Sequence, residues 1–254
     1  SSHQPPKDAS TFHLMVALVL TLACMPVEVA PTGAEEAWVD GELDSDGDGY
    51  LDVWEIAEGS DPYDYDSRIY TGFWPYQPDK DSWRAPSIEG AQAELDAMLG
   101  RFVAMDQHGD FVDVYDFAGQ GQPVVLDLCA MWCGPCHELS MWLLGEEETT
   151  FDAYWEADIP AAVRAGEVQW ITVMTEGDQG ALPDSADLVQ WYEAYPSSEI
   201  PILGDDGRAA EVYLRDGWPS LYLLDEDLRI QAMPTSDQRY AAMDALEVEL
   251  RSSR

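Results

Sequence analysis

Residues 98–254 predict an α/β domain in which a central mixed sheet is flanked by helices. Two apolar runs at 124–128 and 168–174 have the length and composition of buried strands. Apolar residues at helical spacing follow the first run, and residues 236–251 show the same spacing near the C terminus. Strands that alternate with helices are typical of α/β proteins, and the chain is long enough to bury a substantial core.

The charge of the chain is strongly negative. It carries 50 Asp and Glu against 12 Lys and Arg, a formal net charge of −38, while 46% of its 254 residues are hydrophobic. That apolar content is typical of a folded chain. A surface this acidic repels phosphate groups, which excludes nucleic acid and anionic lipid headgroups as partners. It suits cation binding or a salty medium, although plain solubility explains it equally well.

The apolar stretch at residues 14–24 (LMVALVLTLAC) predicts an export signal. Its length suits the hydrophobic region of a signal peptide and is too short to span a bilayer. Its end resembles a bacterial lipobox, which implies cleavage before Cys24 and attachment of a lipid to the sulfur of Cys24. Thr21 departs from the usual Leu, and cleavage after Ala30 without a lipid is the alternative.

This signal sets the expected organisation of the N-terminal part. We expect a signal peptide over residues 1–23, of the lipoprotein type by its ending, and an acidic tether over residues 24–41. The mature protein is then exported to the periplasmic or cell-surface side of a bacterial membrane. A lipid anchor, not a transmembrane span, would hold it there, in a compartment where disulfides persist.

Residues 44–55 (DSDGDGYLDVWE) have the ligand spacing of a calcium-binding loop. Oxygen ligands occupy positions 1, 3, 5, 7, 9 and 12, and a glycine occupies position 6, where such a loop turns sharply. The expected ligands are Asp44, Asp46, Asp48, the carbonyl of Tyr50, Asp52 and Glu55. The alternative is an acidic turn on an already acidic surface.

The residues around this loop indicate which kind of calcium repeat it resembles. The upstream stretch is short for the first helix of an EF-hand, whereas further aspartates follow the loop. Residues 42–67 resemble the thrombospondin type 3 repeat of exported bacterial proteins, which implies added ligands at Asp61, Asp64 and Asp66. We expect structural Ca²⁺ that stiffens the tether. Residues 68–97, which contain several prolines, are expected to be a linker that leads into the main domain.

The main domain carries Cys133-Gly134-Pro135-Cys136 between a predicted strand and a predicted helix. At a helix N terminus, backbone N–H groups and the helix dipole stabilise a thiolate, and a protonated His137 would add to this. Pro135 fits the first helical turn, and the spacing lets the two sulfur atoms meet in one small ring. A zinc site or an inert structural disulfide is the alternative, but zinc needs about four ligands and no second Cys or His pair supplies them.

The segment VVLDLCAMWCGPC resembles the thioredoxin superfamily, and the resemblance covers residues 98–252. It is most similar to exported, often membrane-tethered thioredoxin-like proteins that act as thiol reductases, including in cytochrome c maturation. Such proteins open with a hairpin, which we expect within residues 101–118. They also add a helix and a strand like those expected in residues 187–206. The resemblance thus implies a thioredoxin fold with an N-terminal hairpin extension and, in this chain, a small calcium-loop segment.

The resemblance also implies roles for the residues at the site. Cys133 would be the attacking thiolate and Cys136 the resolving thiol, with Trp132 covering them. Asp127, six residues before Cys133, matches the buried acid of the family. A carboxylate in an apolar strand should have a raised pKa and could take the proton of Cys136. The alternative for Asp127 is a polar core residue whose hydrogen bonds are satisfied.

The resemblance also concerns Pro219, with Trp218 before it, and Cys129. Pro219 would be the cis-proline of the family, at the start of a strand in residues 217–225, and would present the backbone of Trp218 to an extended substrate. Trp218 is unusually bulky for its position. Cys129 also departs from the family, in which a large aromatic residue is common there. It is either a small buried hydrophobe or a third redox thiol.

The predicted activity is the exchange of a disulfide between Cys133/Cys136 and a partner protein. Gly-Pro between the cysteines is typical of reducing family members, so we expect a reductase supplied by a membrane or soluble electron donor. No cofactor is expected beyond the redox-active disulfide itself. An oxidase or isomerase with the same fold is one alternative, and a non-catalytic, calcium-dependent surface binding protein is another.

Overall fold

The computed structural model describes residues 43–47, 50–65, 67, 72–77, 79–88, 93–146, 149–155 and 158–252. The expected signal peptide, the acidic tether and Cys24 lie outside these residues. Asp48 and Asp66 of the expected calcium repeat also lie outside them.

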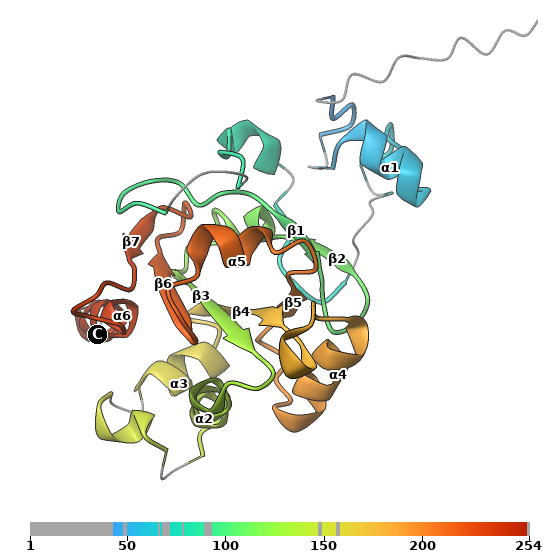
Figure 1. The fold of residues 1–254 in the computed structure, drawn as a ribbon. Helices are drawn as coiled ribbons and strands as arrows, with labels where there is room; N and C mark the ends of the chain where they lie inside the picture. Colours follow the sequence, from blue (N-terminus) through green and yellow to red (C-terminus); the bar gives the residue numbers. More distant parts are fainter. Residues whose placement is uncertain are drawn as a thin grey trace, which may run out of the picture. The chain divides into compact units, whose positions relative to one another are not determined.

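The described residues contain seven strands and six α-helices (Figure 1). The strands are β1 (Val103–Met105), β2 (Phe111–Asp113), β3 (Val124–Ala130), β4 (Gln169–Glu176), β5 (Ile202–Gly204), β6 (Ser220–Leu224) and β7 (Ile230–Ala232). The helices are α1 (Asp52–Glu58), α2 (Gly134–Leu143), α3 (Asp158–Arg164), α4 (Ser185–Ala194), α5 (Ala209–Leu214) and α6 (Ala241–Ser252). Short 3₁₀ helices cover Lys80–Trp83, Val114–Phe117, Phe151–Ala153 and Asp178–Gly180.

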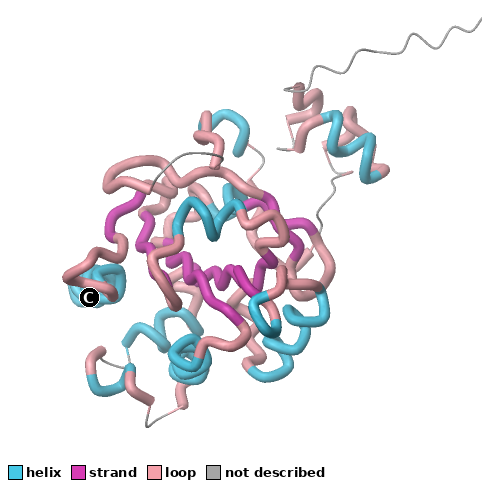
Figure 2. The backbone as a smooth tube through the Cα atoms, in the orientation of Figure 1, coloured by secondary structure: helices cyan, strands magenta, loops and turns pink. Residues whose placement is uncertain are grey.

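These strands form one mixed sheet in the order β2-β1-β5-β4-β3-β6-β7 (Figures 1 and 2). β3 pairs in parallel with β4, and β4 with β5, whereas the other pairings are antiparallel. A β3–α2–β4 crossover therefore lies beside an antiparallel β6–β7 pair followed by α6. This arrangement is the thioredoxin fold that the sequence predicts, and the predicted fold class is confirmed.

The strand β3 lies at the centre of the domain, and its burial explains its composition. All seven of its residues are buried, because β4 and β6 pair with it on both edges and helices cover the sheet. A strand buried on both faces requires a continuous apolar run instead of an alternating one. Asp127 is the one charged side chain within this apolar run, so its burial needs a separate explanation.

The predicted hairpin is confirmed as β1 and β2, which pair antiparallel. Its turn is held by Asp106, whose carboxylate accepts hydrogen bonds from the backbone N–H groups of His108 (2.8 Å) and Asp110 (2.9 Å). Gly109 has a φ of 90°, a conformation that side chains with a Cβ rarely adopt. The sequence pattern His108-Gly109 thus indicated the turn because glycine adopts this positive φ without strain.

The C-terminal helix is shorter than the sequence predicts, and α1, α3 and α5 were not predicted. α6 begins at Ala241, whereas the apolar pattern predicts a helix from residue 236. The intervening residues instead form a turn in which Thr235 and Gln238 exchange two hydrogen bonds, both 3.1 Å long. α3 and α5 are short, so each offers few turns of periodic pattern. Helix α5 begins where the buried Asp205 accepts the N–H groups of Ala210 and Glu211.

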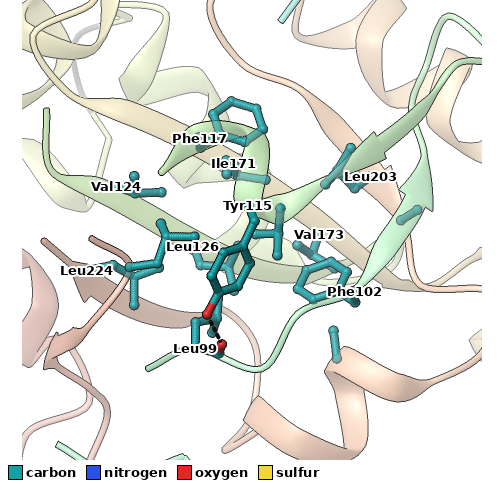
Figure 3. Close-up of a cluster of buried hydrophobic side chains, with 14 of the residues drawn as sticks. Leu99, Phe102, Tyr115, Phe117, Val124, Leu126, Ile171, Val173, Leu203 and Leu224 are labelled. Carbon is teal, nitrogen blue, oxygen red and sulfur yellow. Dashed lines mark hydrogen bonds between the residues drawn. The ribbon is translucent and has the colours of Figure 1, made fainter. Parts of the chain in front are cut away.

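The two faces of the sheet are packed by separate groups of side chains. Figure 3 shows one face, where Leu126 and Val173 pack around Tyr115, whose hydroxyl donates to the Leu99 carbonyl (2.6 Å). The other face is covered by α2, α3 and α6. Their buried residues pack on Val125 and neighbouring strand residues, and include Leu139, Trp142, Ile159, Met243 and Leu246. Figure 1 shows α5 and α2 on opposite sides of the sheet.

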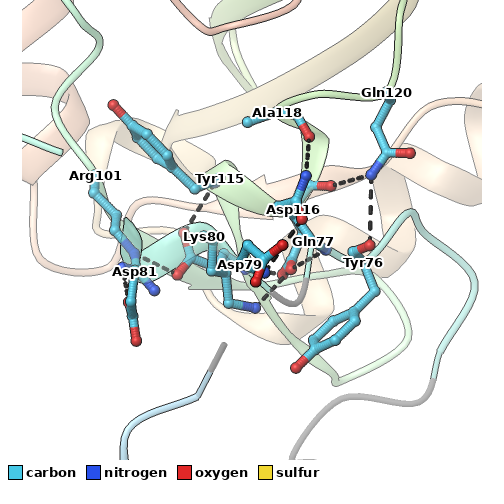
Figure 4. Close-up of polar contacts among 11 residues, drawn as sticks. Tyr76, Gln77, Asp79, Lys80, Asp81, Arg101, Tyr115, Asp116, Ala118 and Gln120 are labelled. Atoms are coloured by element: carbon cyan, nitrogen blue, oxygen red, sulfur yellow. Dashed lines mark hydrogen bonds and ion pairs between the residues drawn. The ribbon is translucent and has the colours of Figure 1, made fainter. Parts of the chain in front are cut away.

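Residues of the expected linker contribute to the buried part of the domain. Lys80 is fully buried, and its Nζ lies 2.6 Å from Oδ1 of the buried Asp116 (Figure 4). The same ammonium group lies 3.8 Å from the ring centre of Tyr50 and 4.3 Å from that of Tyr76. Burial raises the pKa of Asp116, and the charge of Lys80 opposes that rise. Tyr50 of the expected calcium loop therefore packs on the same polar cluster as the main domain.

Candidate functional site

Cys133 and Cys136 form a disulfide at the N terminus of α2, with their Cα atoms 5.3 Å apart. Cys133 is the N-cap residue, and its Sγ accepts a hydrogen bond from the N–H of Cys136 (3.2 Å). Cys133 is 3% exposed and Cys136 is 0% exposed. An N–H donor at the sulfur atom of Cys133 stabilises it as a thiolate when the bond opens.

The local sequence explains why the two cysteines lie where they do. β3 has an irregular register with β4 between Cys129 and Ala130, which ends the regular pairing. A turn follows, in which the N–H of Cys133 donates to the carbonyl of Ala130 (3.0 Å). Pro135 then lies in the first turn of α2, where a backbone N–H has no partner within the helix. Strand, turn and helix thus place both sulfur atoms at one end of the sheet.

Two tryptophans lie beside the disulfide. Trp132 is 51% exposed, and its ring meets that of Trp218 edge-on, with centroids 4.9 Å apart. The indole N–H of Trp132 donates to Glu176 (2.9 Å), at the end of β4. Trp218 packs against the buried cluster that contains Cys133 and Cys136. Each indole is therefore fixed by a hydrogen bond or by packing, and the two rings meet beside the turn that carries Cys133.

The peptide bond between Trp218 and Pro219 is cis, as the resemblance implies. Pro219 directly precedes β6, whose Ser220 pairs with Leu128 of the central strand. The carbonyl of Trp218 accepts a hydrogen bond from the guanidinium of Arg239, in the loop before α6. Arg239 thus contacts the backbone that the family resemblance assigns to substrate recognition. Sequence reasoning did not identify this arginine.

Asp127 lies in the middle of β3 and is 1% exposed. Strand alternation places it on the same face as Val125 and Cys129, the face that α2 covers. Its Oδ1 has no hydrogen-bond partner among the described residues, and burial raises its pKa to about 7. The indole of Trp170 is close enough to oppose this rise but makes no hydrogen bond of normal geometry. The alternative of a satisfied core carboxylate therefore does not describe Asp127.

Cys129 is a free thiol that is fully buried two residues beyond Asp127. Its Sγ lies 3.8 Å from the sulfur atom of Met174, and burial raises its pKa well above the usual value. Its carbonyl accepts a hydrogen bond from the hydroxyl of Thr175 (2.9 Å), which in turn accepts the indole N–H of Trp218 (2.8 Å). Cys129 thus has the environment of a small buried hydrophobe, the first of the two predicted states.

His137 uses both ring nitrogens in hydrogen bonds that the sequence did not suggest. Its Nε2 lies 2.8 Å from the carbonyl of Met131, and its Nδ1 lies 2.7 Å from the hydroxyl of Tyr195. A carbonyl only accepts, so Nε2 must carry the proton. Nδ1 of the neutral ring then accepts the Tyr195 hydroxyl proton. His137 therefore links the active-site turn to the residue after α4, and neither nitrogen donates to a cysteine sulfur.

The expected calcium ligands in the described residues are held by local hydrogen bonds. Asp52 and Glu55 lie in α1, where Asp52 accepts the N–H and hydroxyl of Ser45 at 2.7 and 2.6 Å. Asp44 accepts the N–H of Gly47 (2.8 Å). No group of three or more His, Cys, Asp or Glu side chains within the described residues is arranged to hold a metal ion. Because Asp48 lies outside those residues, the calcium site stays a prediction.

Sequence signals existed for some of the residues that reasoning missed. Thr175 and Glu176 end the strand parallel to β3, and the carboxyl ends of parallel strands meet at one edge of a sheet. That rule places both near the CxxC turn. No comparable signal points to Tyr195 or Arg239, which come from distant parts of the chain.

The fold and the site together define a thioredoxin-fold protein with a CxxC disulfide. A thioredoxin-fold sheet carries a CxxC disulfide at the start of its crossover helix, and a cis-proline lies ahead of the neighbouring antiparallel strand. No helix in the described ranges combines the length and the apolar character needed to cross a membrane.

No protein-family model matches the sequence, and no curated protein matches it either. Three solved structures are similar to this protein, and each similarity extends over nearly the whole of the solved chain. The thioredoxin domain of a thiol-disulfide oxidoreductase from Bacteroides vulgatus is 18% identical, with a TM-score of 0.44 over 63% of this chain and 99% of that one. A protein described as a thiol:disulfide interchange protein DsbE, from Chlorobium tepidum, is 21% identical, with a TM-score of 0.46 over 64% and 99%. Peroxidoxin BcpB from Mycobacterium tuberculosis is 16% identical, with a TM-score of 0.46 over 64% and 99%.

Proposed function

We propose that this protein is a thiol–disulfide oxidoreductase that acts as a reductase of partner proteins outside the cytoplasm. The observation that carries the proposal is the disulfide at the N terminus of α2, in which Cys133 is the N-cap residue and its sulfur accepts the N–H of Cys136. A structural disulfide does not require this position, whereas exchange requires a stabilised thiolate, which a helix N terminus favours. The export signal in the sequence supports a location on the periplasmic or cell-surface side.

The reductase would reduce its partner by two successive thiol–disulfide exchanges. The Cys133 thiolate attacks a disulfide of the partner, which forms a mixed disulfide and releases one partner thiolate that takes a proton from solvent. The Cys136 thiolate then attacks the Cys133 sulfur, which closes the Cys133–Cys136 disulfide and releases the second partner thiolate. The partner gains two electrons and the enzyme loses two, while solvent supplies the proton of the first partner thiol and the proton released by Cys136 balances that of the second. A donor protein dithiol must reduce the enzyme disulfide again, from the membrane or from solution.

Asp127 has the properties of a proton acceptor for the second step. It is buried on the face of the sheet under α2, and its pKa of about 7 lies between those of a free carboxyl and a thiol. A base is effective when its pKa is near the working pH. Asp127 would accept the proton from Cys136 as that thiol becomes the nucleophile.

The reduction potential of the Cys133–Cys136 couple, titrated in defined thiol/disulfide buffers, tests both the activity and its direction. We expect a value near or below about −250 mV, which marks a reductant. A value near about −120 mV would instead mark an oxidase, the alternative with the same fold.

Two variants separate the enzyme from a non-catalytic binding protein. Cys133→Ser should abolish exchange with a small disulfide, because it removes the attacking sulfur. Cys136→Ser should accumulate a stable mixed disulfide, because the resolving thiol is missing. If the couple shows no reversible redox behaviour, or Cys133→Ser leaves turnover unchanged, the enzyme proposal is wrong.

We also propose structural Ca²⁺ in the loop of residues 44–55. The support is the carboxylate spacing in the sequence, together with the packing of Tyr50 on Lys80 of the main domain. Isothermal titration calorimetry should show uptake of one Ca²⁺ at micromolar to millimolar concentrations, and Asp44→Asn/Asp46→Asn should abolish it. Thiol exchange should persist after chelation. Absence of Ca²⁺ uptake at millimolar concentrations would contradict this proposal.

A further inference from the structure

A cleft of about 680 Å³ opens beside the disulfide, between the first turns of α2, residues 150–155 and the start of α6. It is lined by residues from these three segments, which include Pro135, Glu138, Tyr154, Trp155, Arg239 and Tyr240. Such a volume suits a few side chains of an extended segment. Pro135, which lies between Cys133 and Cys136 in the sequence, lines this cleft, so the cleft borders the segment that carries the disulfide.

Aromatic side chains form one wall of this cleft. Phe151, Trp155 and Tyr240 pack on one another, with ring centroids 5.3 to 5.7 Å apart. Trp155 is fixed by a hydrogen bond from its indole N–H to Asp244 (3.0 Å). Tyr154 beside them is 72% exposed. A fixed aromatic wall with an exposed tyrosine is the kind of surface that binds a partner side chain with little loss of entropy.

The charges around the cleft are mainly negative. Three carboxylates line it, those of Glu138, Asp237 and Asp244, against one guanidinium, that of Arg239. The guanidinium of Arg239 donates a hydrogen bond to the carbonyl of Trp218, the residue before the cis-proline, so one of its donors is already used. The cleft therefore attracts a cation and repels an acidic side chain.

We propose that this cleft recognises a lysine or arginine of the partner protein, close in sequence to the partner's reacting cysteine. The inference rests on the proposed oxidoreductase function and adds the substrate class to it. The aliphatic stem of such a residue would lie on the aromatic wall, and its charge would meet the ring faces and the carboxylates. Since Pro135 joins the cleft to the disulfide, a partner chain of about two to four extended residues would connect the two positions.

Peptide disulfides of defined charge test this proposal with the full-length reduced protein. Each peptide carries one cysteine in a mixed disulfide with a small chromogenic thiol, and lysine, norleucine or glutamate is placed two, three or four residues from it on either side. At physiological ionic strength we expect kcat/KM to decrease in the order lysine, norleucine, glutamate for at least one spacing. The lysine peptide should exceed the glutamate peptide by about tenfold.

A double variant assigns this preference to the cleft. Glu138→Gln/Asp237→Asn should reduce the ratio of lysine to glutamate rates to about threefold or less, and should leave the norleucine peptide unchanged. The matched control is Glu193→Gln/Asp206→Asn, which removes the same charge from two exposed positions that do not line the cleft. The control should keep the full preference. Tyr154→Ala should slow the lysine and norleucine peptides alike.

The outcomes separate this inference from the proposed function. If the protein exchanges with a small disulfide but treats the three peptides equally, the cleft proposal is overturned and the oxidoreductase proposal stands. If the double variant and its control lose the preference equally, the charge of the whole chain causes it, and the cleft proposal is again overturned. Failure to exchange with any small disulfide would instead overturn the proposed function.

Discussion

At the scale of the residue, Asp127 shows how burial changes the chemistry of a side chain. It lies in a fully buried strand, and none of the residues that the structure describes makes a hydrogen bond to its Oδ1. The charged form of such a carboxyl is poorly solvated, so the folded state holds its proton more tightly than the unfolded chain does. The resulting loss in the free energy of unfolding is greatest at high pH, where the carboxyl is ionised in both the folded and the unfolded state.

We predict that Asp127→Asn stabilises the oxidised protein at high pH and has little effect at low pH. The pKa is about 7 in the folded state and about 3.9 in the unfolded chain, so the wild type loses stability as pH rises from 4 to 7. The full loss, on the order of 4 kcal/mol, persists above pH 7. Urea unfolding of both proteins between pH 3 and 9 would measure it. A difference between them that does not change with pH contradicts the prediction.

The hydrogen bond between Tyr195 and His137 permits a second prediction. Tyr195→Phe removes the donor to Nδ1 while the ring stays in place, so the free energy of unfolding should fall by about 1 kcal/mol. Tyr192→Phe, in the last turn of α4 just before Tyr195, is the matched control, because no such hydrogen bond involves its hydroxyl in the described residues. The control should change stability by less than half as much in urea unfolding. Equal effects of the two variants would show that the contact with His137 adds no stability.

At the scale of the element, the buried pair of Lys80 and Asp116 connects the segment before β1 to the rest of the domain. Lys80 begins a 3₁₀ helix, and Asp116 lies in the 3₁₀ helix after β2. The N–H of Gln77 also donates to the carboxylate of Asp116 (3.1 Å), and Tyr50 and Tyr76 surround the ammonium group. A charged pair this deeply buried stabilises the fold only while both partners are present.

We predict that Lys80→Met destabilises the protein by about 3 to 5 kcal/mol, because it leaves the buried carboxylate of Asp116 without its cation. The double variant Lys80→Met/Asp116→Leu should recover much of this loss, because no buried charge remains. Chemical unfolding gives the energies, and limited proteolysis of residues 50–88 reports local release. A double variant less stable than Lys80→Met alone would contradict the assignment.

At the scale of the whole molecule, the excess of carboxylates acts on stability and on partners alike. A formal net charge of −38 on 254 residues produces self-repulsion that is greatest in the compact state. Salt at about 0.15 M screens such repulsion beyond roughly 8 Å. The same field attracts basic partners from a distance, which agrees with the proposed preference of the cleft.

We predict that the melting temperature rises when NaCl increases from 10 mM to 500 mM. Screening should relieve the repulsion among carboxylates more than it weakens the few ion pairs at the surface. The increase should be several degrees, measured by calorimetry in a calcium-free buffer with chelator, so that Ca²⁺ binding does not contribute. A melting temperature that falls with salt would show that attractive pairs dominate.

The sequence by itself determined the CxxC motif, the main strands along the chain and the fold class. Each of these depends on local chemistry: an apolar run makes β3, a glycine makes the β1–β2 turn, and Pro135 fits the first turn of α2. The start of α6 was predicted five residues too early, because Thr235 and Gln238 close a turn there and the apolar pattern does not record this.

Only the tertiary structure decided which distant residues meet around the disulfide. Tyr195 reaches His137 across 58 positions of sequence, and Arg239 reaches Trp218 across 21. Lys80, in a segment expected to be a linker, pairs with Asp116 36 positions away. The physical reason is the same in each case. A residue's spacing along the chain predicts its helix or strand, whereas its partner across the fold depends on how the sheet brings separate segments together.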